Sequence, residues 1–150
     1  MKKLTILLFA LLLTGCHQSK PVTLYDLDDV PIKISKDERV WHIVNYWADW
    51  CAPCIKEIPA LNEFEAAHSG KVKVLGVHAD ALSVPELKAR AEKLGIQFAV
   101  LKQDPRHELG LKPVQVLPTT YVINPDGKIL GPFVGIQSET SLNHIISLKG

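Results

Sequence analysis

Short stretches in which apolar and polar residues alternate predict strands near the start of the folded region. Residues 22–24 and 32–34 have this pattern, and the acidic residues between them favour a turn, so a small hairpin is expected. Residues 42–47 and 72–77 are nearly continuous apolar runs, which are typical of buried strands in the centre of a sheet.

Apolar residues spaced three and four apart predict helices after each of these two buried strands. A helix over 51–69 is expected to end at Gly70. A second helix should begin at a capping box formed by Ser83 and Glu86 and stop at Gly95. The residues expected to face inward are Ile55, Ile58 and Leu61 in the first helix and Leu87, Ala91 and Leu94 in the second.

The rest of the chain predicts a short strand at 98–101, a helical turn at 107–111 and a hairpin over 119–134. The turn of that hairpin is Asn124-Pro125-Asp126-Gly127. A helix over 138–148 closes the chain. Strand–helix–strand units followed by a hairpin and a helix predict a three-layer α/β domain, with a central sheet flanked by helices.

The first residues of the chain have the pattern of a targeting segment. Lys2 and Lys3 precede an apolar run at 4–13, which is too short to span a bilayer and fits the core of a signal peptide. Leu13-Thr14-Gly15-Cys16 resembles the bacterial lipobox, which implies cleavage before Cys16 and lipidation of that cysteine. An ordinary signal peptide that leaves Cys16 as a free thiol is the alternative.

This interpretation divides the chain into a lipoprotein signal peptide (1–15), a lipidated cysteine with a short tether (16–21) and one domain (22–150). The five tether residues after Cys16 reach at most about 17 Å, so the domain is expected close to the outer side of a bacterial membrane, facing the periplasm in a Gram-negative cell. Removing 1–15 changes the charge from 17 − 16 = +1 to 15 − 16 = −1. A near-neutral domain is not expected to bind nucleic acid, and we expect a monomer.

The chemistry of the chain is concentrated in Cys51-Ala52-Pro53-Cys54. Such a pair is a redox dithiol, half of a zinc site or a coincidence. A zinc site needs two further ligands, but the remaining cysteine is Cys16 and the histidines have no ligand spacing, so neither a metal nor a cofactor is expected. Three residues of helix advance about 4.5 Å, which suits a disulfide. Because Cys51 starts a helix, where N–H groups favour an anion, we expect it to be the attacking thiol and Cys54 the resolving one.

The stretch 46–54, Tyr-Trp-Ala-Asp-Trp-Cys-Ala-Pro-Cys, resembles the active site of thioredoxin-fold proteins. It is most similar to the TlpA/ResA-type membrane-anchored thiol-disulfide oxidoreductases. Glu57, Pro59 and the segment 117–128 match the same group. The resemblance implies a mixed central sheet, an N-terminal hairpin and a cis-proline, Pro118, before the C-terminal hairpin.

One position departs from ordinary thioredoxins. Six residues before the first cysteine those proteins have a buried, proton-relaying aspartate, and this chain has Asn45. Glu57 lies one helical turn beyond Cys54, so it is the nearest replacement, and burial would raise its pKa. The alternative is that Glu57 is a solvated helix residue.

The resemblance implies reduction of disulfides in extracytoplasmic client proteins, with cytochrome c maturation as one setting. Cys51 would attack the client and Cys54 would release it, while Pro118 lies against the dithiol. A membrane electron-donor protein would re-reduce the pair. The residues expected to contact the client are Trp50, Ala52, Pro53, Leu117 and Thr119. A dithiol oxidase or isomerase, or a redox-inactive binding or chaperone module on the same fold, are the alternative functions.

Overall fold

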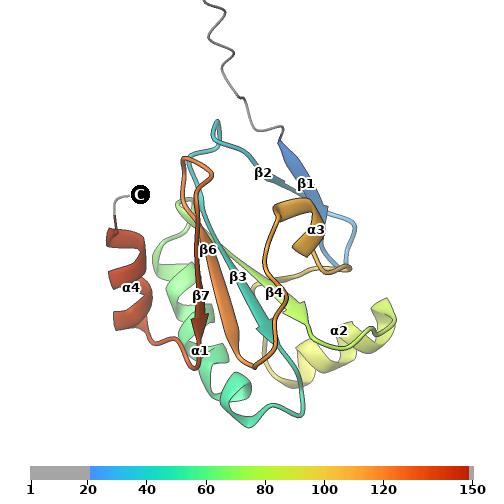
Figure 1. The fold of residues 1–150 in the computed structure, drawn as a ribbon. Helices are drawn as coiled ribbons and strands as arrows, with labels where there is room; N and C mark the ends of the chain where they lie inside the picture. Colours follow the sequence, from blue (N-terminus) through green and yellow to red (C-terminus); the bar gives the residue numbers. More distant parts are fainter. Residues whose placement is uncertain (1–20, 149–150) are drawn as a thin grey trace, which may run out of the picture.

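The computed structural model of the protein describes residues 21–148, so the predicted signal peptide, Cys16 and nearly all of the tether lie outside the described residues. A five-stranded sheet forms the centre of the molecule, and a separate two-stranded hairpin packs against it (Figure 1). In chain order the elements are β1 (Val22–Tyr25), β2 (Pro31–Ile34), β3 (Trp41–Trp47), α1 (Ala52–Ala67), β4 (Val72–His78), α2 (Val84–Lys93), β5 (Ala99–Val100), α3 (Arg106–Leu109), β6 (Thr119–Ile123), β7 (Ile129–Val134) and α4 (Glu139–Ser147).

The sheet is mixed, as predicted. Its strand order is β5-β4-β3-β6-β7; β3, β4 and β5 run parallel, while β6 pairs antiparallel with both β3 and β7. Because parallel neighbours need a crossover, α1 connects β3 to β4 and α2 connects β4 to β5. The predicted N-terminal hairpin is present, with β1 antiparallel to β2.

Alternating residues of the central strands build two cores, one on each face of the sheet. Ile43 of β3 faces α1 and α4, where it packs with Phe64 and Leu142. Val44, the next residue, faces the β1–β2 hairpin and packs with Ile32. A third cluster, at the end of the sheet where β3 leads into α1, contains both Cys51 and Cys54 and residues of α2.

Several boundaries and one buried face differ from the sequence expectations. Ile55 is 37% exposed, because the inward face of α1 follows Cys54, Ile58 and Leu61 at i, i+4 and i+7 and leaves position 55 outside. The strand expected at 98–101 is reduced to Ala99–Val100, and the helical turn begins one residue earlier than expected. Leu94 and Ile146 are only partly buried.

Two other expectations from the sequence are confirmed. Glu86 accepts hydrogen bonds from the N–H and hydroxyl of Ser83, which forms the predicted capping box of α2. The Leu117–Pro118 peptide bond is cis, as predicted, and Gly131–Pro132 is a second cis bond that was not predicted. Within residues 21–148 no helix has both the length and the apolar character needed to cross a bilayer.

Candidate active site

The dithiol lies where strand β3 gives way to helix α1. Cys51 is the N-cap residue of α1, with its N–H donating to Ala48 O at 3.2 Å and its carbonyl accepting from Ile55 N at 3.1 Å. Pro53 occupies the first turn, where a backbone N–H has no helical acceptor to lose. A buried strand therefore delivers the first cysteine to the start of a helix, as the sequence predicts.

Cys51 and Cys54 are joined by a disulfide, with their Cα atoms 5.3 Å apart, so the structure shows the oxidised state. Cys54 N–H points to Cys51 Sγ at 3.3 Å. In this state Cys51 is 5% exposed and Cys54 is fully buried. The accessible edge of the disulfide still belongs to Cys51, because only its side of the bond reaches the surface.

The surroundings of the two sulfur atoms are mostly apolar. The third hydrophobic cluster packs Trp47, Leu87 and Ala91 with the cysteines, and Leu117 covers part of it. Apolar surroundings disfavour a thiolate, whereas the start of a helix favours one. The apolar surroundings and the helix start therefore act in opposite directions on the stability of a Cys51 thiolate.

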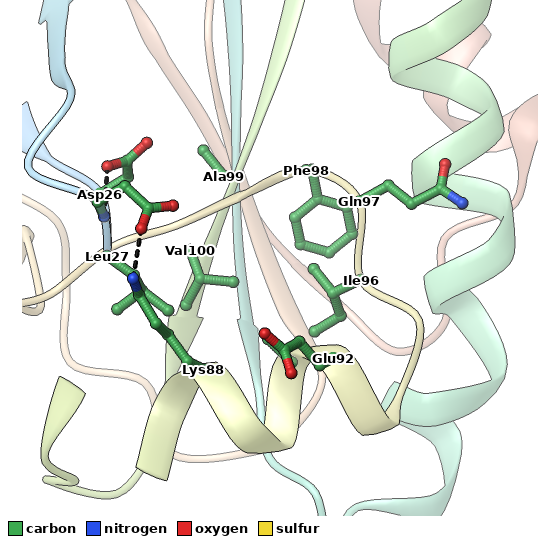
Figure 2. Close-up of a pocket in the computed structure, with 11 residues that line it drawn as sticks. Asp26, Leu27, Lys88, Glu92, Ile96, Gln97, Phe98, Ala99 and Val100 are labelled. Carbon is green, nitrogen blue, oxygen red and sulfur yellow. Dashed lines mark hydrogen bonds and ion pairs between the residues drawn. The ribbon is translucent and has the colours of Figure 1, made fainter. Parts of the chain in front are cut away.

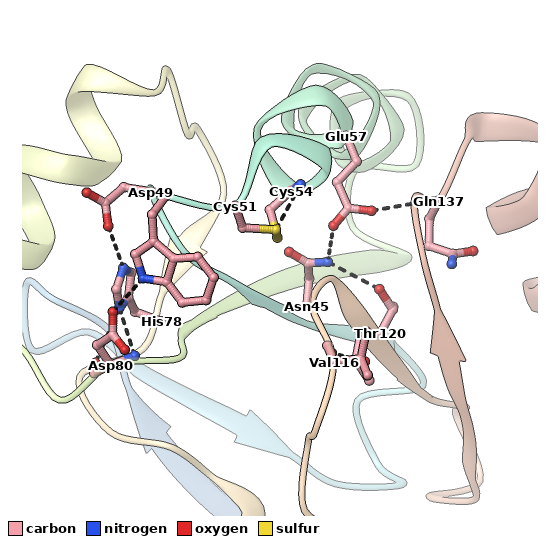
Figure 3. Close-up of a disulfide and its surroundings, with 12 residues drawn as sticks. Asn45, Asp49, Cys51, Cys54, Glu57, His78, Asp80, Val116, Thr120 and Gln137 are labelled. Carbon is pink, nitrogen blue, oxygen red and sulfur yellow. Dashed lines mark hydrogen bonds and ion pairs between the residues drawn. A yellow bond between two sulfur atoms is a disulfide. The ribbon is translucent and has the colours of Figure 1, made fainter.

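Glu57 lies on the buried face of α1, one turn after Cys54, and is only 1% exposed. Its carboxylate accepts two hydrogen bonds, from Asn45 Nδ2 at 2.7 Å and from Gln137 N at 2.9 Å (Figure 3). Burial raises the pKa of Glu57, and the two donors only partly oppose this rise. The alternative of a solvated helix residue is therefore excluded.

Asn45 occupies the position of the buried aspartate of ordinary thioredoxins but has a different role. Its amide nitrogen donates to Glu57 and also to Thr120 Oγ1 at 3.2 Å, so it holds the carboxylate instead of accepting a proton (Figure 3). Sequence reasoning missed Thr120 and Gln137. Gln137 acts through its backbone N–H, for which side-chain identity gives no signal, whereas Thr120 lies two residues after the predicted cis-proline.

The cis-proline loop is tied down from both sides. Pro118 and Thr119 are buried, and the Pro118 carbonyl accepts a hydrogen bond from Gly135 N at 2.9 Å. Thr119 was expected to contact the client, but it is 2% exposed and its hydroxyl donates to Val116 O at 2.6 Å. Its side chain therefore serves the loop itself, and Leu117 is the partly exposed residue there.

The residues around Cys51 that were expected to meet a client are exposed. Ala52 and Pro53 are exposed at the start of α1. Trp50 is 65% exposed, and its indole N–H donates to Asp80 Oδ2 at 2.8 Å. Because that bond fixes the polar edge of the ring, Trp50 presents an anchored apolar surface beside Cys51.

A polar cluster on the other side of the dithiol was not predicted. The carboxylate of Asp49 contacts His78 Nε2, and the backbone N–H of Asp80 donates to His78 Nδ1 at 3.1 Å (Figure 3). The same carboxylate also accepts a hydrogen bond from Arg90 Nη1. The His78 side chain is buried and packs edge-on against Trp47.

A hollow of about 460 Å³ lies behind the site, between α2 and the segments that precede β2 and β5 (Figure 2). Leu27, Ala91 and Val100 form its inner wall and separate it from the cysteines, while Lys88 pairs with Asp28 at its rim. No cluster of three or more His, Cys, Asp or Glu side chains suited to a metal ion occurs among residues 21–148.

The sequence profile of the AhpC/TSA family matches residues 17–131, which is more than half of the chain. The chain belongs to the AhpC/TSA family. Among curated proteins it is similar to the thiol-disulfide oxidoreductase ResA of Bacillus subtilis (strain 168), with 28% identity over 126 residues that cover 83% of this chain and 70% of ResA. ResA of Bacillus thuringiensis (strain Al Hakam) is 29% identical over 118 residues, which cover 78% of this chain and 68% of that protein.

Solved structures agree on the fold. A thiol:disulfide interchange protein of the thioredoxin family from Chlorobium tepidum TLS superposes with a TM-score of 0.70 at 25% identity, over 85% of this chain and 92% of that one. The exposed lipoprotein thioredoxin Etrx1 from Streptococcus pneumoniae strain TIGR4 has a TM-score of 0.71 at 20% identity, over 85% of this chain and 98% of that one. The similarity to ResA and the Cys51–Cys54 disulfide make the protein a ResA-like thiol-disulfide oxidoreductase, and the solved structures show its thioredoxin-like fold.

Proposed function

We propose that the protein reduces disulfides in polypeptide clients outside the cytoplasm while a lipid on Cys16 holds it at a membrane. The reducing direction is supported by the weak stabilisation of a thiolate at Cys51. Its sulfur receives one hydrogen bond from the first turn of α1, from Cys54 N, because Pro53 has no N–H to give. A strong oxidant needs a strongly stabilised reduced form. Weak stabilisation favours the disulfide and makes the dithiol a reductant.

The reaction is a dithiol–disulfide exchange. Cys51 thiolate attacks one sulfur of the client disulfide, a mixed disulfide forms and the second client sulfur leaves as a thiolate. Cys54 then loses its proton and attacks Cys51, which releases the first client sulfur. Glu57, buried beside Cys54 on α1, accepts that proton, and solvent protonates the two client thiolates. One disulfide is formed and one is broken, so two electrons pass to the client.

A polypeptide client fits the surface around the dithiol. Trp50 is exposed before Cys51, Val116 is exposed before the cis-proline, and Val134 pairs with Thr119 across the sheet. Ile136, also exposed, precedes the residue whose N–H binds Glu57. Exposed apolar side chains around one reactive bond are typical of a protein-docking surface.

The position of the proposed anchor bears on how partners reach the site. Val22, the first residue of β1, lines the same hollow as His42, near the start of β3, whereas Cys51 follows the other end of β3. Figure 1 shows the start of β1 and the end of β3 at opposite ends of the molecule. A strand of this length spans about 20 Å. With a tether of at most about 17 Å, the dithiol would face away from the membrane. We propose that clients, including apocytochromes, and a membrane electron donor meet the domain on that outer side.

The direction is tested by the midpoint potential of the Cys51–Cys54 pair, measured by equilibration in thiol–disulfide buffers and mass spectrometry. We expect a value near the thioredoxin value of about −270 mV. A value above about −180 mV, in the range of isomerases and oxidases, would reject reduction in favour of the alternative functions.

Two further experiments test the client and the anchor. A Cys54→Ser variant should trap the client as a mixed disulfide with Cys51, and mass spectrometry would identify it. A Cys16→Ser variant should become soluble, keep its activity on small disulfides and lose activity on the client in cells. Wild-type protein that fractionates as soluble, without a lipid on Cys16, would contradict the anchor.

A further inference from the structure

Two acidic side chains flank the dithiol, and their surroundings differ (Figure 3). Glu57 is buried on one side, where burial raises its pKa. Asp49 is partly exposed on the other side, two residues before Cys51, and hydrogen bonds from Arg90 are the main cause that lowers its pKa. Paired carboxyl groups whose environments separate their pKa values take different roles. Asp49 is therefore a carboxylate at neutral pH.

A permanent negative charge at Asp49 acts against the chemistry of Cys51. A carboxylate near a thiol disfavours the thiolate, whereas the helix start favours it. Among residues 21–148, one N–H, that of Cys54, contacts Cys51 Sγ, so the helix start stabilises a thiolate there only weakly. A compensating positive charge near Asp49 is needed if the thiolate is to persist at neutral pH.

Arg90 supplies this charge from a different element. It lies on α2, 41 residues away in sequence, and its Nη1 is 2.7 Å from each carboxylate oxygen of Asp49. Both side chains are about two-thirds buried, so solvent screens the pair less than it would on an open surface. The ion pair also joins α2 to the loop that carries the nucleophile.

His78 contacts the Asp49 carboxylate from the end of β4. Its Nδ1 accepts the Asp80 N–H at 3.1 Å, and its Nε2 lies 3.2 Å from Asp49 Oδ1. Packing against Trp47 holds the ring in place. Among residues 21–148, the charged or titratable groups around Asp49 and Cys51 include Arg90 and Glu86 on α2, His78 at the end of β4 and Asp80 after it. On α1 they include Glu57 and, in the reduced protein, the Cys54 thiol.

We propose that Arg90 is a positioning residue of the exchange reaction: it neutralises Asp49 beside Cys51 and thereby keeps the Cys51 thiolate available at neutral pH. The proposal rests on the proposed function in taking Cys51 as the attacking thiol, and its test requires knowledge of neither the redox direction nor the client. The step itself is simple: the Cys51 thiol loses a proton to solvent, and the thiolate then attacks a disulfide sulfur.

The test measures alkylation of the reduced, full-length protein in detergent by iodoacetamide from pH 5 to 9, with Cys51 resolved from Cys54 and Cys16 by tandem mass spectrometry. Arg90→Gln leaves the charge of Asp49 uncompensated. The pH at which Cys51 alkylation is half-maximal should therefore rise, and the alkylation rate of Cys51 at pH 7 should fall about two- to fivefold. Arg90→Lys keeps the charge and should stay near the wild type. Lys93→Gln removes the same charge from an exposed position of the same helix and should change nothing.

Asp49 variants separate a charge effect from a structural one. Asp49→Asn should move the midpoint down, and Asp49→Asn with Arg90→Gln should return it to the wild-type position, because neither charge remains. An unchanged profile for Arg90→Gln, or a double variant as slow as Arg90→Gln alone, would overturn the proposal. If Arg90→Gln fails to fold, the Asp49→Asn variant tests the proposal instead: a lower pH midpoint for Cys51 alkylation would support it, and an unchanged midpoint would overturn it. Faster alkylation of Cys54 than Cys51 in the wild type would instead show that the nucleophile is misassigned.

Discussion

Replacing Glu57 with glutamine removes a titrating group without changing the size of the side chain. In the wild type both carboxylate oxygens face N–H donors, Asn45 Nδ2 at 2.7 Å and Gln137 N at 2.9 Å. Glutamine offers one oxygen and one NH₂ group, so its nitrogen would face one of these donors. A buried polar group left without a partner costs about 1–3 kcal/mol.

Asn45 can remove most of that cost by turning its amide through half a turn. Its oxygen would then accept from the new amide at position 57 and from the Thr120 hydroxyl, which can donate as well as accept. The new amide's oxygen would keep the hydrogen bond from Gln137. We therefore expect Glu57→Gln to fold normally and to cost about 1 kcal/mol or less at low pH, where wild-type Glu57 is protonated.

The stability difference should depend on pH with a definite sign. Because the pKa of Glu57 is raised by burial, the folded protein holds this proton more tightly than the unfolded chain. The contribution of Glu57 to the free energy of unfolding is therefore fully present below the pKa of glutamate in the unfolded chain. It is lost as the pH rises through the pKa of Glu57 in the folded protein. Within that window the slope is at most about 1.4 kcal/mol per pH unit. The variant lacks this loss, so its stability relative to the wild type should rise with pH and then level off.

Urea unfolding of the oxidised protein between pH 4 and 8 would measure this difference, and stopped-flow resolution of a mixed disulfide on Cys51 would measure the chemistry. Loss of the base should slow the Cys54 step on the order of 10- to 100-fold at pH 7. Glu65→Gln is the matched control, since Glu65 is on the same helix, accepts a backbone N–H from Val74 and also has its pKa raised by burial. An unchanged pH–rate profile for Glu57→Gln, or equal slowing by Glu65→Gln, would refute the role.

Three further outcomes follow from the site and its packing. In the reduced protein Cys51 should alkylate on the order of tenfold faster than Cys54 at pH 7, because only Cys51 reaches the surface and the helix start; equal rates would contradict this assignment. Trp50→Ala should raise KM for a protein disulfide and leave the rate with a small disulfide and the melting temperature unchanged, since the ring is exposed; equal loss on both substrates would argue against docking. Gly76→Ala would bring a Cβ to 3.0 Å from Phe98 Cε2 and Trp47 Nε1, so urea unfolding should show a loss of about 1–3 kcal/mol, and an unaltered midpoint would show that the core can yield.

Much of the fold could be predicted because its signals are local. The capping box at Ser83, the buried runs that became β3 and β4 and the cysteine at a helix start depend on neighbours within a few positions, and each is present. Ile55 was misplaced because apolar spacing at i and i+3 fits more than one face of a helix. The buried face was decided by Cys54 and Glu57, which a hydrophobic pattern leaves out.

The polar shell of the site could be predicted only in part. The position of Glu57 relative to Cys54 follows from helix geometry, but its second donor is a backbone N–H 80 residues away. That contact exists because β7 returns beside β6 and delivers the segment before α4 to the buried face of α1. No residue type in that segment carries the signal, since any residue other than proline offers the same N–H.

Arg90 is a different case, because its place was implied by residues already recognised. Leu87 and Ala91 are the buried residues of α2, and both pack in the cluster that holds the cysteines. A residue next to Ala91 is rotated by about 100° from it and so emerges at the border of the buried face. With α2 packed against that cluster, a long cation at this border reaches the loop before the dithiol, where Asp49 meets it. Both charges and the buried face of α2 could therefore be predicted from the sequence. The position of α2 beside the end of β3 could not, because it depends on the parallel crossover from β4 to β5.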